Sequence, residues 1–267
     1  MASVDKVESA LAAAVLVVWA LSLAGTRWAA PRALTSRPAW VGLGLGLHAA
    51  SLGAAWWSAG HLPLDSMRFG LSALALWVAL GWGWLRAQPR MESLGVLLIG
   101  LVVLLFGAAQ LAPNAGGGTA REGLWFPAHV TLILVGLGGL AVSASLSSVF
   151  LFVQRQLKAK RFQGLARLPS LDVLDRRNYQ AMSFGFVCLT AGMAIGGVWA
   201  ATHPEASMGP TFTVWGTVLL WMWYAAALHA RLVSGWQGRL AAVFGVGGFV
   251  GMGAMVAIAA VVLRGWH

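Results

Sequence analysis

The sequence predicts an all-α polytopic membrane protein, a bundle of eight transmembrane helices that forms a single integral membrane domain over residues 1–267. Two observations predict this fold class. Only 10% of the 267 residues are charged and 59% are hydrophobic, with a mean hydropathy of +0.76, whereas a soluble domain has about a quarter charged residues. The chain also contains eight long stretches free of Asp, Glu, Lys and Arg: 9–26, 38–64, 69–85, 93–120, 123–154, 178–204, 206–230 and 240–263.

Each stretch is long enough for a helix that crosses the hydrocarbon core, which needs about 20 apolar residues. Trimmed at Gly, Pro and polar edges, the stretches predict helices at 7–25, 39–59, 66–85, 93–112, 127–154, 179–201, 211–231 and 239–263. The first is expected to be retained, because it begins with Asp5, Lys6 and Glu8 and no cleavage site follows it. Strands are excluded, because these runs exceed the length of a barrel strand and lack period-two alternation.

The distribution of basic residues predicts the orientation of the chain in the membrane. Lys and Arg collect in cytoplasmic loops. Of the 18 Lys and Arg residues, four lie on the predicted outer side of the membrane. The other fourteen lie in the connections predicted on the opposite side: Arg27, Arg32, Arg37, Arg86, Arg90, Arg155, Lys158, Lys160, Arg161, Arg167, Arg176, Arg177, Arg231 and Arg239. This places both termini outside, which in a bacterial inner membrane is the periplasm.

The longest predicted inner connection is the basic cytoplasmic loop 155–178. Its stretch 162–175 mixes apolar and charged positions, which fits an amphipathic segment lying among the lipid headgroups. A solvated basic linker is the alternative interpretation.

Several functional classes are disfavoured. The net charge of +10 is explained by topology rather than by nucleic acid, because the basic residues do not line one face. Cys188 is the only cysteine and lies in an apolar run, so thiol redox chemistry is not expected. No phosphate loop, nucleophile elbow or acid pair is present, and no catalytic residue is predicted.

Two histidines are predicted to lie inside the bilayer, where an ionisable residue is costly and points to function. His48 falls about nine residues into its helix and therefore near the midplane, and His229 lies near the inner end of its helix. Neutral imidazole is a common axial ligand of haem iron. A histidine hydrogen-bonded to a backbone carbonyl of a neighbouring helix is the alternative.

The other four histidines, His61, His129, His203 and His267, all fall on the predicted outer side. Tryptophans accompany them at Trp56, Trp57, Trp125, Trp199 and Trp266. Indoles are ordinary at a membrane interface, and they are also suited to stacking on a porphyrin. Zinc is the rival metal, but its sites have closely spaced ligands, so the dispersed histidines favour a large planar ligand.

Four stretches resemble the cytochrome c assembly superfamily of haem-handling membrane proteins, CcsA and its relative HemX. The first stretch begins at His48 and ends in the turn Gly60-His-Leu-Pro-Leu-Asp-Ser, and the second is Pro127-Ala-His-Val. The third is Leu168-Pro-Ser-Leu-Asp-Val-Leu-Asp-Arg-Arg-Asn-Tyr. The fourth is Leu228-His-Ala-Arg together with Gly235-Trp-Gln-Gly-Arg. The resemblance covers the chain from about residue 40 to its end.

The resemblance implies haem b, one or two molecules. His129 and His267 would correspond to the external haem ligands of the family, and His48 and His229 to its ligands inside the membrane. CcsA-type synthases carry a Trp-rich loop, whereas the stretch 202–212 here contains neither Trp nor Asp. The resemblance therefore favours the HemX branch, and covalent attachment of haem is disfavoured.

The leading functional hypothesis is a protein that transports, passes on or senses haem in cytochrome c assembly or haem biosynthesis. Its expected partners are the lipid bilayer, haem and cytochrome c assembly components. One alternative is a regulator that binds glutamyl-tRNA reductase through the loop 155–178. Another is a haem-free transporter of a small solute, although no internal repeat of the kind found in transporters is evident.

Overall fold

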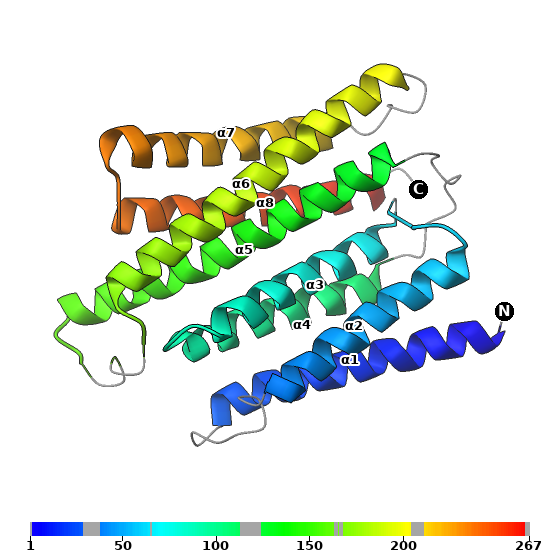
Figure 1. Cartoon of the computed structure of the whole chain (residues 1–267), viewed down its shortest axis with the longest axis horizontal. Coiled ribbons are helices and arrows are strands. Elements are labelled where there is room, and N and C mark those ends of the chain that lie inside the picture. Colours follow the sequence, from blue (N-terminus) through cyan, green and yellow to red (C-terminus); the bar gives the residue numbers. More distant parts are fainter. Residues whose placement is uncertain are drawn as a thin grey trace. The chain divides into compact units, whose positions relative to one another are not determined.

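The computed structural model describes residues 2–28, 38–64, 66–112, 124–162, 165, 168–203 and 211–264. These residues form helices and connections and contain no strand, which confirms the all-α prediction. Eight α-helices and the 3-10 helix Met91–Leu94 are present (Figure 1): α1 (Ala2–Trp28), α2 (Pro38–Ala59), α3 (Met67–Arg86), α4 (Gly95–Leu111), α5 (Trp125–Lys158), α6 (Leu171–Thr202), α7 (Thr211–Ser234) and α8 (Arg239–Arg264).

The chain divides into two compact units, Met1–Pro127 and Ala128–His267. In the first unit, α1 packs against α2 and α4, and α3 packs against the same two helices. Trp19, Leu98 and Phe106 are fully buried in this unit. Arg68 near the start of α3 donates to the carbonyl oxygens of Ala109 and Gln110 at the end of α4, at 3.3 and 3.0 Å. A cation is favourable there because the last carbonyls of a helix have no partner within it.

In the second unit, the backbones of α5 and α6 approach each other closely. At Gly136 of α5, an added Cβ would lie 2.8 Å from the backbone nitrogen of Leu189 in α6. At Gly185 of α6, an added Cβ would lie 2.8 Å from the carbonyl oxygen of Gly136. Small residues permit such backbone contact between membrane helices. These glycines therefore set the separation of α5 and α6.

Helical structure occupies both ends of the range 155–178, which was predicted as the basic inner loop. Residues 155–158 belong to α5, and 171–178 are the first two turns of α6. Ser170 caps α6, because its hydroxyl accepts from the backbone N–H of Val173 at 3.5 Å, and Arg176 pairs with Asp172 one turn away at 2.7 Å. The apolar runs of α5 and α6 stop at the charged residues of this range. The helical backbone continues through these residues because they are solvated and locally paired.

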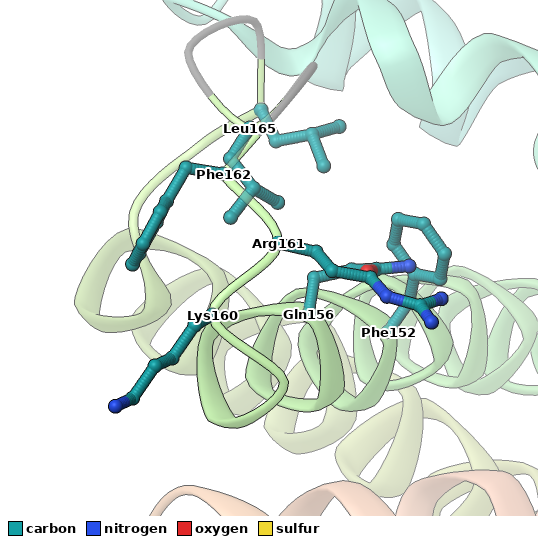
Figure 2. A pocket seen from close by; sticks show the side chains of 7 residues that line it. Phe152, Gln156, Lys160, Arg161, Phe162 and Leu165 are labelled. Carbon is teal, nitrogen blue, oxygen red and sulfur yellow. The ribbon is translucent and has the colours of Figure 1, made fainter.

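The end of α5 is a Schellman motif. Lys160 adopts a left-handed backbone with φ of 55°, and the N–H groups of Lys160 and Arg161 donate to the carbonyls of Leu157 and Gln156 at 3.1 and 3.0 Å. This turn carries the chain back past the last turns of the helix. A hollow lies between this part of α5 and the following residues (Figure 2).

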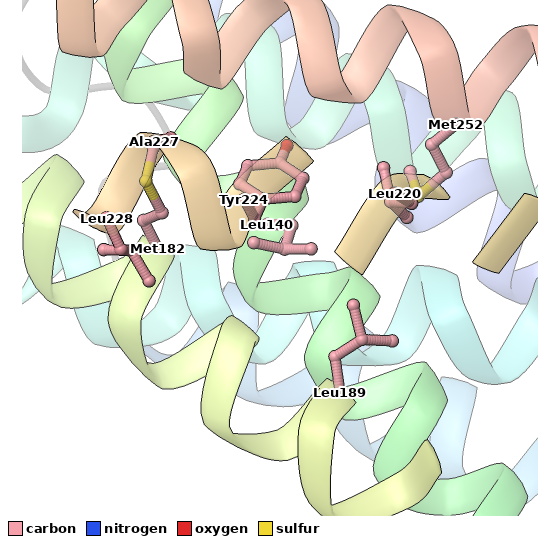
Figure 3. Packing of buried hydrophobic residues seen from close by; sticks show 8 residues of the cluster. All are labelled: Leu140, Met182, Leu189, Leu220, Tyr224, Ala227, Leu228 and Met252. Carbon is pink, nitrogen blue, oxygen red and sulfur yellow. The ribbon is translucent and has the colours of Figure 1, made fainter. Parts of the chain in front are cut away.

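The hydrophobic core of the second unit is built by α5, α6, α7 and α8 (Figure 3). Tyr224 lies at its centre, fully buried, and its hydroxyl donates to the carbonyl of Gly245 in α8 at 3.3 Å. Ser143 of α5 donates to Asn178 of α6 at 2.6 Å, and both are buried. These buried polar groups are thus paired across the helices. The cluster consists of Leu140, Met182, Leu189, Leu220, Tyr224, Ala227, Leu228 and Met252.

Four helices contain segments whose length and composition suffice to cross a membrane: Lys6–Ala24, Met67–Arg86, Trp125–Lys158 and Leu171–Thr202. Gly95–Leu111 and Arg239–Ala254 are shorter apolar segments. These findings support a multi-pass membrane protein. Within the described residues, α2 and α7 are not among these segments, and each carries three tryptophans and one histidine, which reduce its hydropathy.

Candidate histidine sites and the Asp175–Arg231 ion pair

His129 lies one turn after the exposed Trp125, on the same face of α5. Its Nδ1 is 2.7 Å from the carbonyl oxygen of Gly192 in α6. A carbonyl oxygen can only accept, so Nδ1 carries the proton and donates. Nε2 is then the nitrogen with a lone pair. Metal-ligating histidines usually have this arrangement, in which a carbonyl or carboxylate accepts from one ring nitrogen and orients the other.

Gly196 of α6 makes room for the His129 ring, and Gly192 makes room for Ile133 of α5. A Cβ added at Gly196 would overlap Cε1 and Nδ1 of the imidazole, and one added at Gly192 would lie 3.0 Å from Ile133 of α5. The ring therefore lies directly against the helix backbone. Any larger residue at position 196 would displace it.

His203 is the residue after α6 and is exposed. Its ring stacks on that of Trp199, with centroids 5.3 Å apart and planes 13° apart. Nδ1 lies 3.2 Å from the carbonyl oxygen of Trp199 and 2.9 Å from the hydroxyl of Thr202. The stack and these hydrogen bonds fix this imidazole at the end of α6.

His48 is fully buried, with 0% exposure, within the first unit. Nε2 lies 3.1 Å from the carbonyl oxygen of Ser72 in α3, and the ring meets Phe106 of α4 edge to face at 4.6 Å. This hydrogen bond is the one that the alternative interpretation predicts. However, Nδ1 is buried and has no partner among the described residues. An unpaired buried polar atom is costly, so the hydrogen-bonding capacity of this nitrogen is unsatisfied.

The remaining histidines are His61 and two predicted ligands, His229 and His267. His229 is exposed on α7, in the second unit. His267 lies outside the described residues. His61 follows α2 and is half-buried. Within the described part of the chain, no three residues among His, Cys, Asp and Glu form a group suited to a metal ion.

One ion pair was not predicted from the sequence. Arg231 of α7 donates to both carboxylate oxygens of Asp175 in α6, at 3.0 and 2.6 Å, and the two side chains are only 13% and 14% exposed. The N–H of Gly238 also donates to Asp175 at 3.0 Å, and the guanidinium lies 4.6 Å from the ring centre of Tyr179. Both stretches of the second half of the chain that carry the resemblance contribute residues to this cluster.

The ion pair joins the start of α6, the end of α7 and the turn before α8. A bidentate pair with an arginine fork is geometrically specific. Gly238 fits the turn because its φ of 64° is left-handed. Arg231 lies two residues after His229, so the pair fixes the backbone of the α7 segment that carries this histidine. The sequence signals were the two stretches that carry the resemblance and the spacing of Asp175 and Tyr179, four residues apart on one helix face.

These features define a multi-pass helical membrane protein with oriented histidines at the start of α5 and inside the first unit. Residues 65–264 match the model of the family described as cytochrome C assembly protein. The chain belongs to the cytochrome c assembly protein family.

Curated relatives are named cytochrome c biogenesis protein CcsA. Those of Synechococcus sp. (strain CC9902) and Parasynechococcus marenigrum (strain WH8102) are 31% and 30% identical over 231 residues, covering 73% of this chain and 73% of each relative. The CcsA of Gloeothece citriformis (strain PCC 7424) is 27% identical, and the match covers 76% of this chain and 77% of that relative. These names support the family without supporting the preference for HemX, and they give no support to glutamyl-tRNA reductase as a partner.

Proposed function

We propose that the protein binds haem b and passes it on in cytochrome c assembly, with His129 as an axial ligand at the outer membrane face. The observation that carries this proposal is the 2.7 Å hydrogen bond from His129 Nδ1 to the carbonyl of Gly192. It leaves Nε2 as the acceptor nitrogen, which is the form of imidazole that ligates iron.

The donor set fits haem. A neutral imidazole is a common axial ligand, and the iron supplies one-electron redox chemistry when haem is bound. The ring of His129 is held by α6 before any ligand arrives, so little orientational freedom is lost on binding. The exposed indole of Trp125, one turn earlier on the same face, provides an apolar surface beside it.

The other ligands remain predictions from the sequence. His267 would be the second outer-face ligand, and His48 and His229 would serve haem inside the membrane. The orphaned Nδ1 of His48 supports a ligand role for this residue. The exposure of His229 is compatible with such a role.

The proposal includes a topology in which all eight helices cross a bacterial inner membrane with both termini outside. The excess of Lys and Arg in alternate connections supports it. A role in carrying haem rather than attaching it is favoured because the stretch 202–212 contains no Trp or Asp. We therefore propose an activity nearer to that of HemX.

The test is the absorption spectrum of the purified full chain in detergent, oxidised and dithionite-reduced, after reconstitution with haem b. We expect a Soret band in the wild type, its reduction in His129→Ala, and no change in His203→Ala, an exposed histidine that is not a predicted ligand. A wild-type protein without a Soret band would reject haem binding. Equal spectra for the wild type and His129→Ala would reject the ligand assignment.

A further inference from the structure

We propose that the hollow at the C-terminal end of α5 binds the phosphate headgroup of an anionic phospholipid. The hollow has a volume of about 890 Å³. Its wall combines apolar side chains with two cations and one amide. The lining residues are Phe152, Gln156, Lys160, Arg161, Phe162, Leu165 and Leu168.

The Schellman turn decides where the cations lie. Because Lys160 turns the backbone through the left-handed region, Arg161 is carried back over the last turns of α5. Figure 2 shows the guanidinium of Arg161 lying beside the side chains of Gln156 and Phe152, whereas Lys160 extends away from them. Arg161 is thus the cation that faces the hollow, and Lys160 contributes charge at its rim.

The hollow lies at the depth of lipid headgroups. α5 has 34 residues and is therefore about 51 Å long, well beyond the roughly 30 Å of the hydrocarbon core. Its apolar run ends at Val153, and Phe152 is 51% exposed. The first charged residue is Arg155, followed by Lys158. The hollow therefore spans the change from apolar to basic surface, as a lipid does between its acyl chains and its phosphate.

The charge of this region is unbalanced. Among the described residues, no ion pair joins Lys160 or Arg161 to a carboxylate. The acidic residues at the start of α6 are already paired, since Asp172 binds Arg176 and Asp175 binds Arg231. An unpaired guanidinium next to an amide donor complements a phosphodiester, which Arg can bind in a bidentate manner. Basic sites of this kind at a membrane surface select anionic lipids.

The test measures lipid retention by the full chain. The protein is delipidated in neutral detergent, titrated with dioleoylphosphatidylglycerol or dioleoylphosphatidylcholine, and analysed by native mass spectrometry. We expect the anionic lipid to bind more tightly. Arg161→Gln lowers its affinity about tenfold, as expected for the loss of one charge-assisted hydrogen bond.

Two variants serve as controls. Lys158→Gln removes the same charge from the same helix end but is not part of the lining, so affinity should stay within about twofold. Arg161→Lys keeps the charge without the bidentate fork, so it should lose less affinity than Arg161→Gln, which separates loss of charge from a disturbed turn. Circular dichroism checks that each variant keeps its helical content.

Three results would overturn the proposal. The first is equal affinity for the two lipids. The second is an equal loss of affinity in Arg161→Gln and Lys158→Gln, which would indicate diffuse attraction by the basic surface. The third is displacement of the anionic lipid by inorganic phosphate at similar concentration, which would identify the ligand as free phosphate. The outcome does not depend on whether the chain binds haem.

Discussion

Replacing Gly196 by alanine tests whether the α6 backbone positions the imidazole of His129. The added methyl group would overlap Cε1 and Nδ1 of the ring, so the ring must move. The hydrogen bond from Nδ1 to Gly192 is 2.7 Å long, and a shift of about 1 Å takes it beyond the usual limit of about 3.2 Å. The substitution therefore breaks the hydrogen bond that orients the ligand.

The size of the effect follows from the loss of that orienting bond. Removing a hydrogen bond that orients a metal ligand lowers affinity about 10- to 100-fold, which corresponds to roughly 1.4–2.8 kcal/mol. Gly197→Ala is the matched control, because an added Cβ there meets nothing within 4 Å. Both substitutions gain about 0.5–1 kcal/mol of helix stability, so a difference between them isolates the contact with the ring.

The assay is a titration of each purified variant with ferric haem b, followed by Soret absorbance. We expect the dissociation constant of Gly196→Ala to rise about 10- to 100-fold and that of Gly197→Ala to stay at the wild-type value. Equal affinities in the two variants would refute the reasoning, because they would show that the ring is not held by this contact.

Three further outcomes are expected. Asp175→Asn breaks a largely buried bidentate pair and lowers the free energy of unfolding by about 1.5–3 kcal/mol. Asp172→Asn breaks a pair whose side chains are 67% and 78% exposed, and it lowers this free energy by only about 0.3–0.5 kcal/mol. Similar midpoints of thermal unfolding for the two variants would contradict this expectation. Gly185→Ala forces α5 and α6 apart and should lower the Tm more than alanine at an exposed helical glycine, and an unchanged Tm would show that the contact relaxes freely. His48→Ala and His229→Ala should each remove the same spectral component of reduced haem, and loss in only one variant would argue against a shared haem.

The helices were predictable because apolar runs follow the length of a membrane crossing. The predicted range 39–59 differs from the observed α2 by one residue. The predicted start of α6 at residue 179 was wrong, because charged residues do not end this helix. Asp172 and Arg176 instead support the helix as a pair four residues apart.

The candidate sites were predictable only in part. Counting along α2 predicts that His48 lies near the midplane of the bilayer. The structure shows a different property, that its side chain is fully buried within the first unit. Nothing local could show that Asp175 meets Arg231, because the two are 56 residues apart in the chain. The same holds for the hydrogen bond of His129 to Gly192, which depends on the crossing of α5 and α6. Pairing between helices is a tertiary property that composition and periodicity do not contain.

The most direct measurement of the central claim is rescue of His129→Ala by free imidazole. Alanine removes the ligand and leaves a space of about its size against Gly196. If His129 ligates haem iron, the variant loses the wild-type Soret spectrum and millimolar imidazole restores it, while 2-methylimidazole, which is hindered beside the nitrogen, restores it poorly. A variant that keeps the wild-type spectrum without imidazole, or a spectrum that imidazole leaves unchanged, would contradict the claim.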